Sequence, residues 1–345
     1  MALHQTIQRL LLTGAKLKVP PAPPAPHAPP ELQPLIDAVA EVHDVYDARA
    51  LHYGHRYRSG FWAIYLLSAL AVLSAMLPLA LGWDTSRLRL HTFAGVWALN
   101  EVLMIGTVTA IYWLGHRRDW QGQWLRARTT AELTGYLPML APLLDYSVPA
   151  MEPNWYLRVF DPGTHLRDAD DVSALCARYE PLARELQATA CSDPGFLSAY
   201  GEWSIEILEQ QRHYHHGNAL KQHALLHRVQ LLNGTLFGLT AIGALLHLVI
   251  HSLWLSLVTT FFPALGASLH GALAQSETYR VGATSERLVV ELGAAIERIR
   301  AALEQQDSAG GTAKAKGAIK AAISLLLEEH QNWHLLVRPH HLPLA

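Results

Sequence analysis

Charged residues are scarce in this chain of 345 residues. Lysine, arginine, aspartate and glutamate together make up 16% of it, and half of the residues are apolar. Soluble globular proteins carry about 25% charged residues, so this composition is unusual for a water-soluble protein. The formal net charge is −2. A chain without excess positive charge lacks the electrostatic basis for nucleic-acid binding, and we expect no nucleic-acid partner.

The patterns that mark catalytic and metal sites are also missing. The two cysteines, Cys176 and Cys191, are too far apart for a C-x-x-C or zinc motif. RHYHH at 212–216 has no carboxylate or thiol at a matching offset, and HQNWH at 330–334 lacks the glutamate of a zinc hydrolase. GGTAKAKG at 310–317 is not a phosphate-binding loop, because no G-K-[ST] follows. We therefore expect no catalytic residue, no metal ion and no cofactor.

The chain does have four long apolar runs, at 61–82, 95–114, 229–250 and 253–274. About 20 apolar residues in a helix cross the hydrocarbon core of a bilayer. Only two residues separate the last two runs, which predicts a tight helical hairpin. The sequence thus predicts an all-α polytopic membrane protein with four transmembrane helices in two hairpins. A buried all-α core of a soluble protein is the alternative.

Basic residues are distributed unevenly around these runs. Seven arginines closely flank the start of the first run and the end of the second, whereas only Arg87 and Arg89 lie between the two runs. Basic residues are enriched on the cytoplasmic side of membrane proteins. The bias predicts a multi-pass protein of the bacterial inner membrane with both termini in the cytoplasm. The seven arginines are Arg49, Arg56, Arg58, Arg117, Arg118, Arg126 and Arg128.

Several cytoplasmic helices are expected to extend from the spans. A proline-rich spacer at 19–34 should be extended and precede the first of them. In 276–306, an apolar face of Leu288, Leu292, Ile296 and Ile299 indicates an amphipathic helix. The other expected helices run from about Pro34 into the first span, from the second span through 116–137, from 195 into the third span, and over 317–336 after a flexible basic linker.

The two halves of the chain resemble each other. An offset of 154 residues places His116 on His270, Arg126 on Arg280 and Glu132 on Glu286. We interpret the series as an internal duplication of a unit made of two spans and a cytoplasmic helix. The expected organisation is a tail and spacer at 1–34, a first unit at 35–140, a connector at 141–195, a second unit at 196–306, and a linker with a terminal helix at 307–345.

Glu101 is the only charged residue inside an apolar run, and Asn100 is beside it. A carboxylate in hydrocarbon is costly and often functional. A 20-residue span ending at Leu114 places Glu101 about 9 Å inside the outer face. It either lines a polar path through the bundle or reaches the outer interface and pairs with Arg87, Arg89 or His91. His116 and His270, at the cytoplasmic ends of two spans, are candidates for an inner constriction.

The segments around the spans resemble a known family. EQQRHYHHGNALKQHALLHRVQ precedes the second hairpin and PALGASLHGALAQSETYRVGATSERL follows it. Together with HYGHRYRSGFW and HRRDWQGQWLRARTTAEL in the first half, they are similar to the bacterial SMODS and SLOG-associating two-transmembrane effector domains, the SLATT superfamily. The cytoplasmic residues to which the resemblance points are Arg58, Arg126, Glu132, Tyr214, His215, Arg280 and Glu286.

The resemblance implies a membrane effector of nucleotide-signalled anti-phage systems. Such a protein would assemble as a homo-oligomer in the lipid bilayer. It would form a pore or perturb the membrane when a nucleotide-sensing or nucleotide-producing partner triggers it. Two alternatives remain open: a non-conducting, membrane-anchored scaffold that recruits cytoplasmic partners, and, more weakly supported, a small-solute transporter.

Overall fold

A computed structural model describes residues 2–15, 17–83, 92–143, 169–190, 193–306, 310–337 and 342. Within these ranges the only regular secondary structure is helical. The main helices are α1 (Leu3–Leu11), α2 (Gln33–Ala80), α3 (Phe93–Arg117), α4 (Trp120–Leu140), α6 (Ala169–Ala190), α7 (Pro194–His247), α8 (Leu253–Gln275), α9 (Thr278–Leu303) and α10 (Gly311–Val337). Two short 3-10 turns, Pro30–Leu32 and Ala141–Leu143, precede α2 and follow α4.

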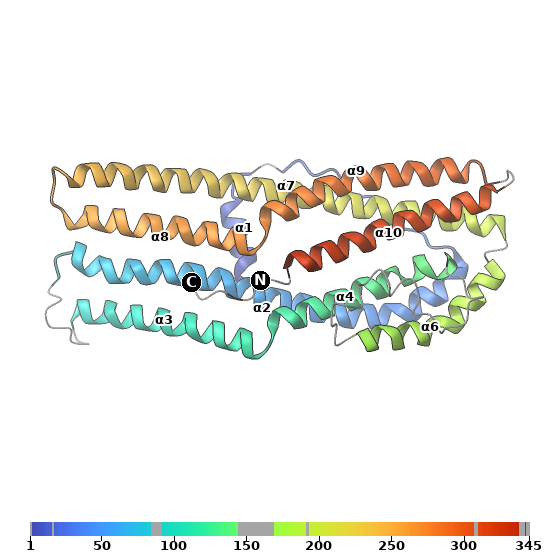
Figure 1. Cartoon of the computed structure of the whole chain (residues 1–345), viewed down its shortest axis with the longest axis horizontal. Helices are drawn as coiled ribbons and strands as arrows, with labels where there is room; N and C mark the ends of the chain where they lie inside the picture. Colours follow the sequence, from blue (N-terminus) through green and yellow to red (C-terminus); the bar gives the residue numbers. More distant parts are fainter. Residues whose placement is uncertain are drawn as a thin grey trace.

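The molecule is elongated, and two very long helices run through most of its length (Figure 1). We call the end that contains the four apolar spans the apolar half, and the end that contains α4, α9 and α10 the polar half. Helix α2 has 48 residues and α7 has 54. At 1.5 Å per residue they are about 70 and 80 Å long, more than twice the thickness of a bilayer core. The predicted unbroken passage of one helix into the first span and of another into the third span is therefore confirmed.

Four helices are long and apolar enough to cross a membrane: α2, α3, α7 and the helical stretch that begins with α8. Their apolar parts lie in the order α7, α8, α2, α3, because α8 packs on both α7 and α2, and α2 packs on α3 (Figure 1). Helices α3 and α7 share no close packing in the described residues. The spans thus form an open row, in which α3 and α7 are the edges.

A helix break follows each of the two shorter spans. The sequence analysis predicted a continuous helix from the second span through 116–137, and this prediction is wrong. Helix α3 ends at Arg117, and Asp119 adopts a left-handed conformation with φ 45° before α4 begins. The carboxylate of Asp119 accepts a hydrogen bond from the Gly122 amide, as an N-cap does. Glu277, between α8 and α9, has the same type of backbone with φ 51°.

The polar half has its own hydrophobic core, which α2, α4, α7, α9 and α10 surround. Leu288, Leu292, Ile296 and Ile299 are all fully buried in it, so the predicted apolar face of α9 is confirmed. Helix α10 begins at Gly311, six residues earlier than predicted, and incorporates part of the expected linker. Alanine and lysine are good helix formers, which explains the longer helix.

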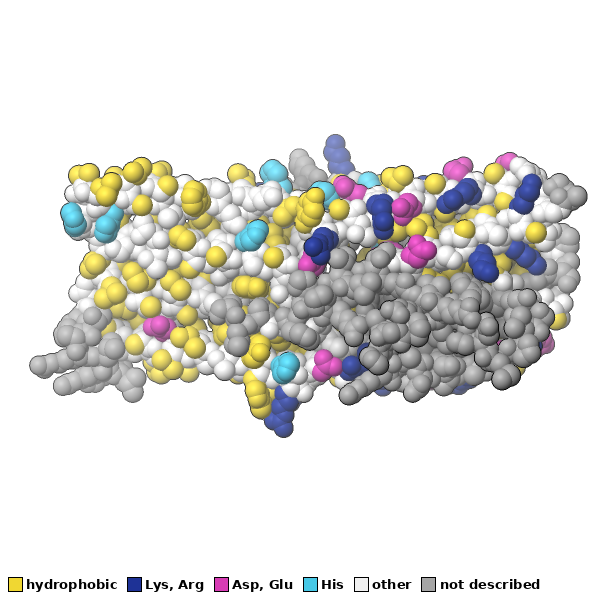
Figure 2. All heavy atoms as spheres, viewed as in Figure 1, with side chains coloured by type: hydrophobic (Ala, Val, Ile, Leu, Met, Phe, Trp, Pro, Cys, Tyr) yellow, Lys and Arg dark blue, Asp and Glu magenta, His cyan; other side chains and the backbone are white. Residues whose placement is uncertain are grey.

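Charge and hydrophobicity divide the surface between the two halves. Lys, Arg, Asp and Glu side chains gather over the half that contains α9, whereas the half built from the four spans is mainly hydrophobic (Figure 2). Large exposed apolar side chains of the spans include Val102, Ile105, Phe237, Leu245 and Trp254. In water such a surface would be unfavourable, and contact with lipid removes this cost.

Candidate functional site

A polar contact joins α2 and α3 inside the apolar half. The side-chain amide of Asn100 donates a hydrogen bond to Ser74 Oγ over 3.0 Å. Ser74 is 1% exposed, so the contact is removed from solvent on the α2 side. In addition, Pro78 lies four residues after Ser74 within α2. A proline has no N–H, so the Ser74 carbonyl lacks its usual helical donor. This part of the span therefore concentrates polar groups.

Glu101 is next to Asn100 and lies on a face of α3 that carries buried residues. Ala94, Val108 and Gly115 are buried on α3, and together with Glu101 they occupy positions seven residues apart on one face of the helix. Glu101 itself is half-buried, and it has no hydrogen bond or ion pair with any residue that the structure describes. The partners considered at the outer interface, Arg87, Arg89 and His91, lie outside the described residues.

His116 and His270 do not meet within one chain. Both side chains are exposed, and their helices, α3 and α8, lie on opposite sides of α2 in the row. The His116 ring stacks on Tyr112 of the same helix, with the ring centroids 6.2 Å apart. A constriction made of these histidines would therefore need side chains from more than one chain.

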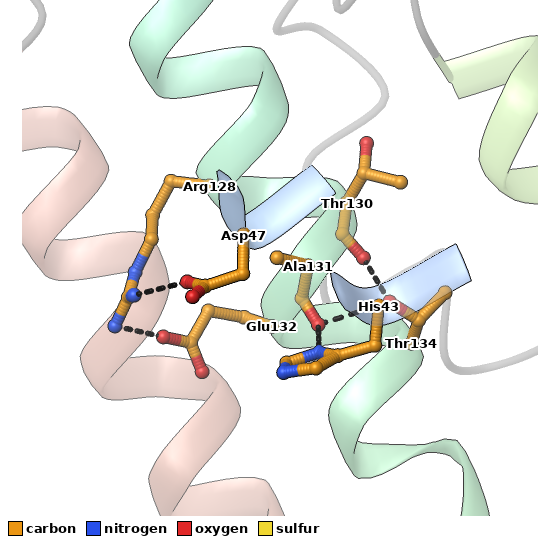
Figure 3. A network of polar contacts seen from close by, with 7 residues as sticks. All are labelled: His43, Asp47, Arg128, Thr130, Ala131, Glu132 and Thr134. Atoms are coloured by element: carbon orange, nitrogen blue, oxygen red, sulfur yellow. Dashed lines mark hydrogen bonds and ion pairs between the residues drawn. The ribbon is translucent and has the colours of Figure 1, made fainter. Parts of the chain in front are cut away.

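In the polar half, an ion-pair network joins α2 and α4 (Figure 3). Arg128 binds the Asp47 carboxylate over 3.5 Å and also pairs with Glu132 on its own helix. Nearby, His43 Nδ1 lies 2.9 Å from the carbonyl oxygen of Ala131. Arg126 has a different role, because it binds Asp119 at the start of α4 over 3.0 Å. The contacts of Arg128 with Asp47 and of His43 with Ala131 hold α4 against α2.

Helix α10 places a further carboxylate, that of Glu329, beside this network. Burial, together with the negative charge of Glu132, raises the pKa of Glu329 to about 7 from the ordinary value of 4.5. Tyr136 is nearby, and burial raises the pKa of its phenol well above the usual range. Protonation of Glu329 near neutral pH would therefore change the charge at the contact between α10 and α4.

The corresponding contact in the second half of the chain joins α7 and α9. Ser285 accepts a hydrogen bond from the Asn218 amide over 2.9 Å, and its Oγ lies 3.4 Å from His215 Nδ1. His215 is buried, and burial lowers its pKa to about 4, so its ring is neutral at neutral pH. His223 lies 3.1 Å from Glu286. These contacts hold α9 against α7.

The other residues to which the family resemblance points are dispersed. Tyr214 is exposed and makes an edge contact with the His215 ring, and Arg280 is exposed and pairs with Glu277 over 3.5 Å. Arg58 is partly buried, and its guanidinium lies over the Trp124 ring. Tyr214, Arg280 and Arg58 thus take part in three separate contacts at different places along the molecule, and they do not form one pocket.

Sequence reasoning missed Ser74, Asp47 and Glu329. Ser74 is one of several small residues in an apolar run, and only the proline four residues later was a readable signal. Asp47 and Glu329 resemble ordinary surface carboxylates, and only the packing of α10 and α4 reveals their surroundings. The histidines of 330–334 and both cysteines have side chains outside the described set. Among the described residues, no three His, Cys, Asp or Glu side chains form a group suited to a metal ion.

Comparisons with family models, with curated proteins and with solved structures gave no match to this chain. The chain is therefore placed only in a broad class: over the residues that the structure describes it is all-helical, and four of its helices are long and apolar enough to cross a membrane.

Proposed function

We propose that the chain is a SLATT-like membrane effector that assembles into a homo-oligomer and opens a conducting path when triggered. The observation that carries the proposal is the position of Glu101. It is half-buried on α3, next to the α2–α3 contact made by Asn100, and has no partner among the described residues. A polar side chain there is costly unless it meets water or a second polar group. A water-filled path beside α3 would supply the water.

The open row of spans explains why several chains would be needed. Four helices in a row enclose no lumen, so a path has to form between chains. The edge helices α3 and α7 each pack closely on one other span in the described part of the chain, and their outer faces are free for a neighbouring subunit. Copies of Glu101, Asn100, His116 and His270 would then form rings near the path.

Helices α2 and α7 offer a route from trigger to membrane. Each runs without a break from the polar half into a span, so a displacement in the polar half moves the span as well. A partner that binds one arrangement of the cytoplasmic helices more tightly would shift the equilibrium towards an open state. The proposed partner is a nucleotide-sensing or nucleotide-producing protein, and the proposed location is the bacterial inner membrane with both termini in the cytoplasm.

Internal duplication of the hairpin unit is part of the proposal. In each hairpin the first span is the last part of a long helix, α2 or α7. After each hairpin comes an acidic residue with positive φ, Asp119 or Glu277. The two positions differ by 158 residues, from 119 to 277, so the backbone favours this offset over 154. Glycine allows close approach in both units: Gly54 faces Trp124 in the first, and Gly282 faces His223 in the second.

The test is membrane potential in cells that express the full chain at matched levels in the membrane. We expect the wild type to depolarise the membrane and Glu101→Leu to alter the effect at least about threefold. Glu304→Gln, which removes an exposed acidic side chain in the polar half, is the matched control and should behave as the wild type. Depolarisation that is the same in the wild type and Glu101→Leu would remove Glu101 from the path.

A scaffold is the second candidate, and one observation favours it. Pro20, Pro21 and Pro24 are exposed, and the arm lies along α7, where the Gln210 amide donates to the Pro24 carbonyl over 3.1 Å. Val19 lies beside Gly217. An exposed polyproline segment is a common ligand of binding domains. If neither the wild type nor Glu101→Leu depolarises the membrane, even with the triggering partner present, the scaffold is the better explanation.

A further inference from the structure

Three basic residues lie on three helices that pack near one another where the apolar half meets the polar half, and two of them, Arg58 and Arg9, act electrostatically on the third, Lys221. Helix α1 packs across α2 and α7 at this border (Figure 1). His4 of α1 anchors the crossing: it is 3% exposed, and its Nδ1 lies 3.2 Å from Ser59 Oγ. Arg58 is the residue before Ser59 on α2, Lys221 is on α7, and Arg9 is on α1. We define these three as the basic cluster.

No described carboxylate neutralises the basic cluster. Arg58 uses its Nε to donate to the Gly54 carbonyl over 3.1 Å, and its guanidinium lies 5.3 Å from the centroid of the Trp124 ring. Neither Arg58 nor Lys221 forms an ion pair with a described residue. Arg128, the next arginine in this region, differs because Asp47 and Glu132 bind it.

The positive charges of the basic cluster lower the pKa values of Lys221 and His4, as expected for groups that lie near one another. Burial, with the nearby charges of Arg58 and Arg9, lowers the pKa of Lys221. Burial is also the main reason that the pKa of His4 falls to about 3, and Arg58, His55 and Lys221 lower it further. The local potential is therefore positive, and His4 stays neutral. Partly buried positive charges without partners are costly, whereas a bound anion removes that cost.

We propose that Arg58, Lys221 and Arg9 form a binding site for a phosphate-bearing anion. A guanidinium with free N–H donors binds two phosphate oxygens at once, and a lysine ammonium adds a point charge. The border between the two halves is the depth at which the phosphates of anionic lipids lie on the cytoplasmic side. The anion is thus either the headgroup of such a lipid or a soluble phosphate compound, which would reach the cluster from the cytoplasm.

The test is equilibrium binding to the purified full chain in a neutral detergent. Radiolabelled phosphatidylglycerol and radiolabelled inorganic pyrophosphate serve as separate probes, and phosphatidylcholine is the zwitterionic control. The variants are Arg58→Gln and Lys221→Gln. Arg56→Gln, which removes an exposed arginine two residues from Arg58 on the same helix, is the matched control. Circular dichroism checks that each variant keeps its helices. If Arg58→Gln does not fold, Lys221→Gln decides the test.

We expect one probe to bind the wild type saturably. Both cluster variants should weaken binding about tenfold or more, because each removes a charge-assisted contact, and Arg56→Gln should change it less than about twofold. Binding of the lipid alone assigns the site to a headgroup, and binding of pyrophosphate assigns it to a soluble ligand. Saturable binding of neither probe, or an equal loss in Arg56→Gln, overturns the proposal. Conduction is not measured, so the outcome does not depend on the proposed effector function.

Discussion

The contact of α10 with α4 is expected to weaken as the pH rises, because of Glu329. This side chain lies beside Glu132 in the polar half, and burial raises its pKa to about 7. The substitution Glu329→Gln keeps the shape of the side chain and removes the ionisation. The charged and titratable groups around Glu329 are Arg128, Glu132 and Tyr136 of α4, Arg287 of α9, and His43 and Asp47 of α2.

The sign follows from the direction of the pKa change. A carboxyl group with a raised pKa in the folded state binds a proton more tightly there than in the unfolded chain. Its stabilising effect is complete below about pH 4.5 and is lost as the pH rises to about 7. The difference between these two pKa values corresponds to about 3 kcal/mol at 1.36 kcal/mol per pH unit, and partial solvent screening reduces it.

Hydrogen exchange of α10 measures this effect in the complete protein. After correction for the intrinsic pH dependence of exchange, protection of the stretch 319–327, which carries the buried face of α10, should fall between pH 5 and pH 8 in the wild type. It should stay nearly constant in Glu329→Gln. Glu328→Gln is the matched control, because Glu328 is the exposed neighbour. The reasoning is refuted if wild type and Glu329→Gln respond equally to pH, or if Glu328→Gln removes the response as well.

Two further predictions concern packing and hydrogen bonding. Gly54→Ala should lower the free energy of unfolding by about 1–3 kcal/mol, because its Cβ would lie 2.8 Å from Trp124 Nε1. Gly317→Ala, where a Cβ meets no atom within 4 Å, should raise it by about 0.5–1 kcal/mol, and the opposite order in detergent unfolding would contradict the packing argument. A double-mutant cycle with Ser74→Ala and Asn100→Leu should give a coupling of about 0.6 kcal/mol, and zero coupling would contradict the hydrogen bond.

Much of the secondary structure could be predicted from the sequence. Long apolar runs favour helices, and the unbroken passage of 33–80 and 194–247 was predicted correctly, although Pro78 lies within the first of these helices. The 3.6-residue spacing placed the buried face of α9 correctly. The break at Asp119 was missed because an aspartate within a helical pattern gives no local sign that its backbone will be left-handed.

The candidate sites were less predictable. Glu101 stood out because a charge is rare in an apolar run, but its side of the helix could not be chosen until α3 was placed against α2. Ser74 is polar yet small, so nothing in the sequence links it to Asn100, 26 residues away. Nothing in the sequence indicated that Arg58 lacks an ion pair with the described residues, because arginines near a membrane border are usually interpreted as topology signals.

Composition and spacing by themselves determined that this chain is helical, that four helices are long and apolar enough to cross a membrane, and that Glu101 is anomalous. These properties depend on local hydrophobicity and helix propensity, which each stretch carries without its neighbours. Only the tertiary structure decided that the spans form an open row, that Glu329 lies beside Glu132, and that α1 brings Arg9 towards Arg58 and Lys221. Such contacts join residues that are far apart along the chain, so they depend on how complete helices pack.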